Sequence, residues 1–585
     1  MSGFSSFRDL AGYGRRELAR DLPAGLAVAF LAVPQGVAYA LIAGIPPAMG
    51  LYAATLPALL ASLLRSSRHV VAGPTNAVSL LVGSAVAIHA DLDPATMAVT
   101  LALMVGVIQV TAGGLRLGAL VDWISAPVVL GYITGAGLLI GLGQLHNVTG
   151  TVGGTGRVDQ KLLTWVGGLG DADLLSIGVA LGTAVVIVVL RKLNRRLPGA
   201  ILAMAGAIAL TMVLGLDERG LTTIADVSVI EGGLPALTLP DLSLVQVLLP
   251  TAVAVAVLSM VESSSVARDI ASRSGQRLAL SSEFLGEGVA NLSAAFLGAY
   301  PVTGSLSRSA LNEREGAATR ASGMMAAVVV MGGVVLAGPL LNFTPIASLA
   351  GLLLVVAVGL VHTDHIRRVM RSHLADKLSF VVTVAGCMTL HLDQAIYLGV
   401  GISLVSYLRQ ARLVRFRDLV VDGSGRLREV SPRGRRIEDG SFVSDAVQYC
   451  AHVHVLNVQG SLFFGAAGEL QAALDEVMAT RATVLVLRLK RARHLDVTIS
   501  DVLVAASRQL SAEGRHLMIV GLTSSAHRYL DEVGTLDELG RDKVFARSRD
   551  HWFAALEEAV QHALELAGQP ESPYADWLAG RDLAG

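Results

Sequence analysis

Long apolar segments with few charged residues fill most of this chain, from about residue 22 to residue 410. Only 42 residues between 21 and 410, about 11%, are charged, whereas residues 411–585 hold 45, about 26%. A soluble chain carries about 25% charged residues. The first part is therefore too apolar to face water, and we expect a membrane-embedded body followed by a soluble C-terminal domain.

The apolar part divides into segments of the length that crosses a bilayer, which is about 20 residues for a helix. The hydropathy pattern predicts fourteen spans, of which the third and the tenth are short. The predicted spans are 22–43, 47–64, 75–90, 95–114, 125–146, 174–190, 197–215, 246–267, 279–298, 304–312, 320–340, 344–361, 377–391 and 394–410.

The distribution of Lys and Arg predicts how these spans are oriented. If the N-terminus is cytoplasmic and the loops alternate, the outer loops hold only Arg157, Lys161 and Arg219. Nearly all the other loop Lys and Arg residues then lie inside, as the positive-inside rule requires. We therefore expect a multi-pass protein of the plasma or inner membrane, with a cytoplasmic N-terminus and a cytoplasmic C-terminal domain.

Two similar segments indicate an internal repeat. Residues 72–79 read AGPTNAVS before the short third span, and residues 299–307 read AYPVTGSLS before the short tenth span. Fourteen spans split into seven and seven, and an odd number of spans makes the second copy insert upside down, as in many secondary transporters. The alternative is a coincidence, because Gly, Ala and Ser are common in all membrane helices.

The starts of the two short spans predict an anion site. A half-helix that begins in the membrane carries roughly half a positive charge and free N–H groups at its N-terminus. Two such ends can hold an anion between them. The residues expected at these ends are Thr75, Asn76, Ala77, Gly304, Ser305 and Ser307. The alternative is a pair of ordinary helices kinked at Pro74 and Pro301.

Two ionisable residues add to this prediction. Arg308 is interpreted as the one basic residue inside a span, where a cation usually marks a transport path or an ion pair. Glu262, late in the eighth span, is the candidate for binding a proton or another coupling cation. The alternatives are that Arg308 pairs with Glu313 or Glu315, and that Glu262 lies in water at the cytoplasmic edge.

Polar residues on two further spans are weaker candidates. Pro34 is expected to interrupt the first span, and Gln35 and Tyr39 lie one turn apart so that both could contact the anion or bond a neighbouring helix. Glu283, Glu287 and Asn291 form a stripe on the ninth span. We interpret this stripe as helix packing or hydration more readily than as ligand binding.

The C-terminal part alternates strand and helix patterns, which predicts a small α/β domain. A strand pair is expected at 453–465 and single strands at 482–489 and 516–522, with helices at 466–480, 498–513, 524–533 and 550–567. The predicted division of the chain is a cytoplasmic N-terminal segment at 1–21, a transmembrane transport domain at 22–412, a linker at 413–445, the α/β domain at 446–568 and a tail at 569–585. Residues 418–445 of the linker could also hold a first strand.

These motifs together resemble the SulP/SLC26 family of anion transporters. The matching pieces are PQGVAYA at 34–40, GIP at 44–46, GLY at 50–52, GPT at 73–75, Glu262-Ser263 and SLSRSALN at 305–312. The C-terminal domain resembles a STAS domain, the usual tail of that family.

The resemblance implies a seven-plus-seven inverted repeat, with spans 1–4 and 8–11 as a core and the others as a gate. It also implies a homodimer in which the core moves against the gate like an elevator, with the anion bound between spans three and ten beside span one. The expected activity is transport of sulfate, bicarbonate or a dicarboxylate by symport with a proton bound at Glu262. Anion exchange and sodium-coupled bicarbonate transport are the alternatives, and a nucleobase–cation symporter of the same fold is a more distant one.

Two positions depart from the family pattern. Sodium-coupled members carry a threonine where this chain has Val266, which disfavours sodium coupling. Thr498 matches the residue that is phosphorylated in bacterial STAS relatives, but Ile499 replaces the glycine that usually follows it.

Other functional classes are less well supported. The net charge of −1 gives no basic surface for nucleic acid, and two cysteines provide no metal cluster. The sequence has no Walker loop, HExxH or GxSxG motif, so we expect neither an enzyme nor a cofactor. A channel and a membrane-anchored signalling protein remain as alternatives, although interrupted helices argue against a mere anchor.

Overall fold

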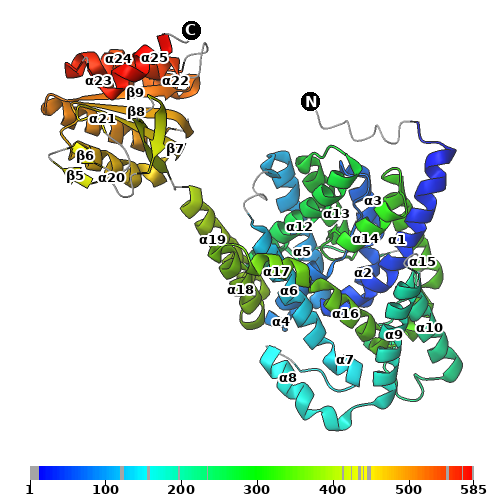
Figure 1. Ribbon diagram of the computed structural model, residues 1–585. Helices are drawn as coiled ribbons and strands as arrows, with labels where there is room; N and C mark the ends of the chain where they lie inside the picture. Colours follow the sequence, from blue (N-terminus) through cyan, green and yellow to red (C-terminus); the bar gives the residue numbers. More distant parts are fainter. Residues whose placement is uncertain are drawn as a thin grey trace. The chain divides into compact units, whose positions relative to one another are not determined.

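The computed structural model describes two compact units, residues 1–404 and 405–585 (Figure 1). The described residues are 12–118, 124–154, 158–194, 198–233, 235–411, 414–422, 425–431, 436–438, 441–443, 449–493, 495–547, 553–569 and 571–582. The predicted N-terminal segment therefore lies largely outside them, and so do parts of the predicted linker.

The first half of the membrane unit contains the first seven predicted spans. Its elements are α1 (Arg15–Ile42), α2 (Pro47–Tyr52), α3 (Leu56–Leu64), β1 (Ala72–Gly73), α4 (Asn76–Ile88), α5 (Pro94–Gly114), α6 (Ala126–Gly143), α7 (Leu145–Thr149), α8 (Val158–Gly167), α9 (Leu174–Leu193) and α10 (Gly199–Leu214). The second span is split into α2 and α3, whereas α1 continues through Pro34. The expected interruption at Pro34 was wrong, because this helix tolerates the missing donor without a break.

The second half contains the other seven. Its elements are α11 (Ile224–Val227), α12 (Val245–Ser274), α13 (Leu280–Phe296), β2 (Thr303–Gly304), α14 (Leu306–Arg314), α15 (Ala321–Ala337), α16 (Ile346–Leu360), α17 (Thr363–Met370), α18 (Leu374–Thr389) and α19 (Leu392–Ala411). Within the described ranges, eight helical segments are long and apolar enough to cross a membrane, with three shorter apolar helices beside them.

Helix packing repeats between the two halves. Helix α1 packs on α15 as α12 packs on α5, and α6 packs on α18 as α16 packs on α9. Likewise α1 contacts both α4 and α14, and α12 contacts the same two helices. These pairs correspond when the seven predicted spans of the first half are matched in order with the seven of the second half. The same contacts therefore occur twice, as the predicted repeat requires.

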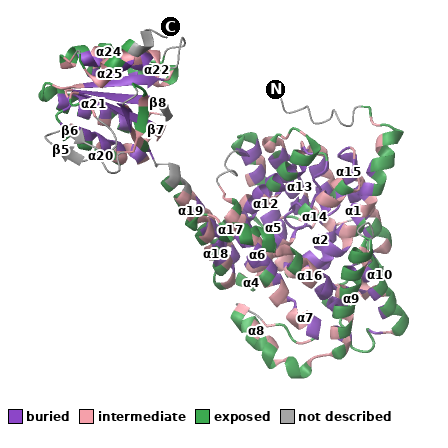
Figure 2. Cartoon of the chain, in the orientation of Figure 1, coloured by how far each residue is buried: buried purple, intermediate pink, exposed green. Residues whose placement is uncertain are grey.

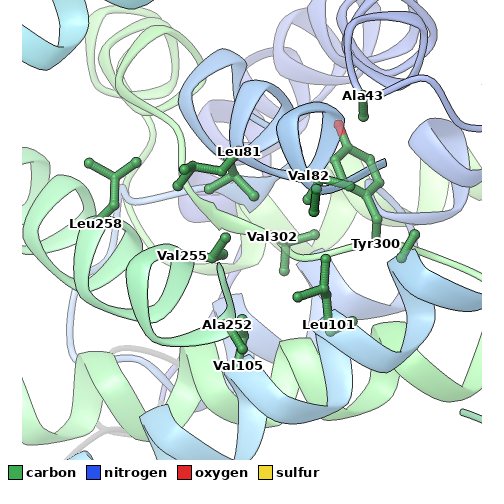
Figure 3. Close-up of a cluster of buried hydrophobic side chains, with 14 of the residues drawn as sticks. Ala43, Leu81, Val82, Leu101, Val105, Ala252, Val255, Leu258, Tyr300 and Val302 are labelled. Atoms are coloured by element: carbon green, nitrogen blue, oxygen red, sulfur yellow. The ribbon is translucent and has the colours of Figure 1, made fainter. Parts of the chain in front are cut away.

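Buried apolar side chains hold the two short helices in place. Figure 2 shows that the buried residues lie inside each unit and that many outward faces of the helices are exposed. In the cluster of Figure 3, Tyr300 and Val302, just before β2, lie among Leu101 of α5, Leu81 of α4 and Val255 of α12. The segment leading into α14 is therefore embedded in the protein rather than exposed to lipid.

Close helix contacts depend on glycine. A Cβ atom on Gly351 of α16 would lie 2.2 Å from the carbonyl oxygen of Ala180 on α9, whereas a Cβ on Gly332 of α15 would meet nothing within 4 Å. We expect Gly351→Ala to destabilise the protein by roughly 1–3 kcal/mol, because it forces α9 and α16 apart. Gly332→Ala is the matched control and should leave the melting temperature of the purified protein unchanged. Equal melting temperatures for both variants would contradict this packing.

The C-terminal unit is a mixed sheet with helices on both faces. In its described part six strands are ordered β10-β9-β8-β7-β3-β4, with β7 to β10 parallel. The elements are β3 (Arg415–Val421), β4 (Leu427–Val430), β5 (Arg436–Glu438), β6 (Ser441–Val443), β7 (Val453–Ser461), α20 (Ala467–Met478), β8 (Val484–Arg493), α21 (Val497–Ala512), β9 (His516–Leu522), α22 (Ser524–Glu532), α23 (Thr535–Leu539), β10 (Val544–Ala546), α24 (Ala554–Ala567) and α25 (Pro573–Asp582).

Alternation along the central strands gives both faces of this sheet an apolar core. Leu485 and Leu487 of β8 point towards α20 and α21, and Val484 and Val486 point towards α24. Two segments differ from the predicted division. The predicted linker supplies β3, which pairs with β7, and the predicted tail forms α25, whose Tyr574 and Trp577 are buried against the sheet.

Candidate anion site

A two-stranded ribbon joins the starts of the two short helices. Strands β1 and β2 pair antiparallel, with Ala72 opposite Gly304 and Gly73 opposite Thr303. The Ser305 N–H extends the ribbon by donating to the Val71 carbonyl over 2.9 Å. Because each strand leads directly into a helix, the ribbon brings the beginnings of α4 and α14 to one place inside the membrane unit.

The N-cap residue of α4 does not cap the helix with its side chain. Thr75 is the N-cap residue in an extended conformation, and its side chain makes no capping hydrogen bond within the described residues. Its hydroxyl instead donates to Glu262 Oε2 over 3.4 Å. The first N–H groups of α4 are thus free of the usual side-chain acceptor, so an external acceptor could bind there.

Arg308 links the two helix starts. Its side chain is fully buried in the first turn of α14, and its Nη2 donates to the Pro74 carbonyl over 2.6 Å. Its Nε and Nη1 atoms have no acceptor among the residues that the structure describes. Buried N–H donors are nearly always paired, so these two nitrogens can take an acceptor from a bound anion.

Gly73 makes room for this guanidinium. A Cβ atom on Gly73 would lie 2.6 Å from Nη1 and 2.9 Å from Cζ of Arg308. The backbone of Gly73 also has a φ of 146°, which side chains rarely permit. Gly73 of the first repeated motif therefore leaves the space that the side chain of Arg308, in the second motif, occupies.

Polar side chains of α1 reach the start of α14. Gln35 is buried, and its Nε2 donates to Ser307 Oγ over 3.4 Å, while its Oε1 has no donor in the described part of the chain. The Ser307 and Ser305 hydroxyls are 3.3 Å apart. Ser307 is exposed although its neighbours Ser305 and Arg308 are buried, so its hydroxyl borders open space. Buried Tyr39 lies one turn after Gln35.

The remaining predicted residues divide into two groups. Glu262 of α12 is partly exposed and contacts Thr75, so it belongs to the cluster. Asn76 is half-buried in the first turn of α4, and the Ala77 carbonyl accepts from Tyr132 Oη over 3.0 Å. Gly304 packs elsewhere, because its Cβ position lies 2.8 Å from Ser263 Oγ. We expected Gly304 to let the ligand approach the backbone, but this contact indicates that the glycine makes room for α12 instead.

Arg65 and Arg320 are further buried cations, which the sequence did not indicate. Arg65, at the end of α3, pairs with Glu287 of α13 over 2.9 Å, and both side chains are completely buried. Buried Arg320 also donates to the Arg65 carbonyl over 2.8 Å. Arg65 and Arg320 lie at helix ends, so Arg308 is still the one basic residue within a predicted span rather than at its end, but it is not the one buried cation. The interpretation of Glu287 as a packing residue remains compatible with this pairing.

Thr498 lies in the C-terminal unit, at the beginning of α21. Its side chain is exposed. Asp496 is the N-cap residue of this helix and accepts from the Ile499 N–H over 3.0 Å.

Comparison with known proteins decides the family. Residues 18–385 match the sulfate permease family, and residues 447–551 match the STAS domain. The chain belongs to the sulfate permease family. This family membership confirms the expected membrane transport domain with a STAS tail, and it makes the chain an anion transporter rather than an enzyme.

Relatives of this permease align along almost its whole length. YvdB of Bacillus subtilis is 28% identical over 542 residues, covering 91% of this chain and 97% of that protein. Sulfate transporter 4.1, chloroplastic, of Arabidopsis thaliana is 26% identical and covers 96% of this chain and 84% of its own. The solved structure of SLC26A9 superposes with a TM-score of 0.85 at 19% identity, covering 96% of this chain and 92% of that one, which shows the shared fold.

Proposed function

We propose that this permease is a secondary active transporter that binds a small anion between the starts of α4 and α14. The observation that carries the proposal is Arg308, a buried guanidinium beside two helix N-termini, two of whose nitrogens have no acceptor among the described residues. Charge-assisted hydrogen bonds from such a group to an oxyanion are short and about twice as strong as neutral ones. Gln35, Tyr39, Ser305 and Ser307 would contribute neutral contacts around the anion.

The donors favour an anion with several oxygens. A guanidinium presents a planar fork of N–H groups that matches sulfate, bicarbonate or a carboxylate. The names of several relatives specify sulfate, as in Arabidopsis thaliana, which makes sulfate the first candidate. Bicarbonate and dicarboxylates are the alternatives with the same chemistry.

Glu262 is the proposed proton site. It contacts Thr75 at the N-terminus of α4 and is partly exposed, so a proton could reach it while the anion site is occupied. Moving one negative charge into a cell costs about 2.3 kcal/mol per 100 mV. A proton carried on Glu262 would offset this cost, which favours proton–anion symport over uncoupled entry. Exchange against an internal anion is the second candidate.

The proposed movement is of the elevator type. Helices α6, α9, α10, α16 and α18 pack mainly on one another, whereas α3, α5, α12 and α13 form a second group that carries the ribbon. Sliding of these two groups past each other would carry the anion across the membrane. We further propose a homodimer in the plasma or inner membrane, with the STAS domain in the cytoplasm.

An anion screen on the purified protein tests the proposal. We expect sulfate, bicarbonate or a dicarboxylate to raise the melting temperature in detergent, and at least one of them to displace another competitively. Uracil should have no effect, because the start of α14 offers Ser307 and Arg308 at the site where a nucleobase symporter would be expected to use a carboxylate. Binding of uracil, or the failure of all three anion classes to compete, would contradict the proposed function.

A further inference from the structure

A buried ion pair lies beside the second strand of the ribbon, where the Cβ position of Gly304 approaches Arg65. Arg65 Nη2 donates to Glu287 Oε2 over 2.9 Å, and neither side chain is exposed. Replacing such a pair by packed apolar residues is often neutral or stabilising, so a buried pair is weak evidence of a stabilising role. Stability alone therefore does not explain why Arg65 and Glu287 are buried inside the membrane unit.

The pair continues into a chain of amides that ends on Val302, the residue directly before β2. Gln109 Nε2 donates to Glu287 Oε1 over 3.3 Å and to Ser259 Oγ over 2.6 Å. Asn291 Nδ2 in turn donates to Gln109 Oε1 over 2.8 Å. Asn291 also holds Val302 twice, because its Oδ1 accepts from the Val302 N–H over 2.7 Å and its Nδ2 donates to the Val302 carbonyl over 3.0 Å.

The two residues of β2, Thr303 and Gly304, contact α12 and the end of α3. Thr303 Oγ1 donates to the Ser259 carbonyl over 3.0 Å. The Cβ position of Gly304 lies 3.0 Å from Arg65 Nη1. Each strand of the ribbon thus has one glycine under a guanidinium, Gly73 under Arg308 and Gly304 under Arg65.

We propose that Arg65, Glu287, Gln109 and Asn291 are positioning residues that fix β2, and through it the start of α14, in the anion-binding geometry. They act through Val302, Thr303 and Gly304, which directly precede Ser305, Ser307 and Arg308. The inference rests on the proposed function, because it assigns these residues to the same anion site. It goes further, since it attributes part of the anion affinity to side chains that do not face the anion.

Two variants test this assembly. Asn291→Leu keeps the size of the side chain but removes both hydrogen bonds to Val302, and Gln109→Met removes the bridging amide without changing the charge. We expect both to weaken binding of sulfate, or of the anion that binds most tightly in the screen, by about tenfold. We also expect amide hydrogen exchange within residues 299–308 to accelerate by at least tenfold, because Asn291→Leu removes the partner of the Val302 N–H and both variants loosen the segment that leads into α14.

Asp21→Asn is the matched control. Asp21 is a fully buried carboxylate that accepts from the Ala318 and Thr319 N–H groups over 2.6 and 3.0 Å at the start of α15. It should lower the melting temperature while leaving anion affinity and exchange in residues 299–308 unchanged.

The outcomes are distinguishable. Unchanged affinity and exchange in Asn291→Leu and Gln109→Met would overturn the positioning role, as would an equal effect of Asp21→Asn on residues 299–308. If the wild type bound no anion, the proposed function would fail, yet the exchange measurement would still report whether these residues hold β2. If one of the two variants does not fold, the other one decides.

Discussion

Replacement of Arg308 by alanine is expected to weaken anion binding by at least about 100-fold. The guanidinium has two nitrogens without acceptors in the described part of the chain, both inside a buried site. Hydrogen bonds to charged groups contribute about 1.5–3 kcal/mol each, and 1.4 kcal/mol corresponds to a factor of ten. Isothermal titration of the purified variant with the anion identified in the screen measures the loss.

Two further variants separate charge from shape. Arg308→Lys keeps the charge but not the fork, so its affinity should lie between those of wild type and Arg308→Ala. Arg273→Gln is the control, because Arg273 is an exposed arginine whose partners are Asp269 and Glu313. It should bind like wild type. The melting temperature of Arg308→Ala should change little, because the substitution also removes a buried charge. Wild-type affinity in Arg308→Ala would remove this residue from the site.

The spans and the two short helices could be predicted because both follow from local sequence. Apolar length is sufficient to locate a membrane helix. The combination of proline, glycine and hydroxyl residues at 72–79 and 299–307 marks the places where a helix starts late. The sequence accordingly predicts a cluster of Gln35, Thr75, Glu262, Ser307 and Arg308, and the structure brings these residues to the starts of α4 and α14.

Contacts between distant segments could not be predicted in the same way. Pairing of Gly73 with Thr303 joins residues more than 200 positions apart, and no local pattern specifies it. Arg65 was assigned to a cytoplasmic loop because an apolar segment ends at it, whereas its partner Glu287 on α13 draws it into the protein. The role of Gly304 depends on Ser263, which the sequence places on another span.

The limits of the C-terminal domain were misjudged for a related reason. Strand β3 is followed by a polar, Gly-containing segment that fits either a linker or a first strand, and its pairing with β7 assigns it to the sheet. Helix α25 looks like a polar tail, yet Tyr574 and Trp577 cover the apolar face beside α24. A hydrogen bond from Tyr574 to the Leu419 carbonyl connects these two segments.

Substitution of Glu262 by glutamine is expected to abolish the response of transport to a proton gradient. Glutamine has the same shape and can still bond to Thr75, but it cannot carry a proton. In proteoliposomes of the wild type, one pH unit, acidic outside, should raise anion accumulation about tenfold if one proton accompanies each anion. Glu262→Gln should show the same uptake with and without the gradient. Glu313→Gln, which removes a carboxylate paired with Arg273, should respond like wild type.

The charge of the transported anion sharpens this prediction, because Glu262 can carry only one proton. Symport of one proton with bicarbonate moves no net charge, so a membrane potential imposed with potassium and an ionophore should leave the uptake unchanged. Symport of one proton with sulfate moves one negative charge, which an inside-negative potential opposes by about 2.3 kcal/mol per 100 mV. Sulfate accumulation should therefore fall by roughly 50-fold when 100 mV is applied. If sulfate uptake did not change with the membrane potential, a second proton site would be required. If Glu262→Gln still responded to the proton gradient, the coupling proton would bind to another residue.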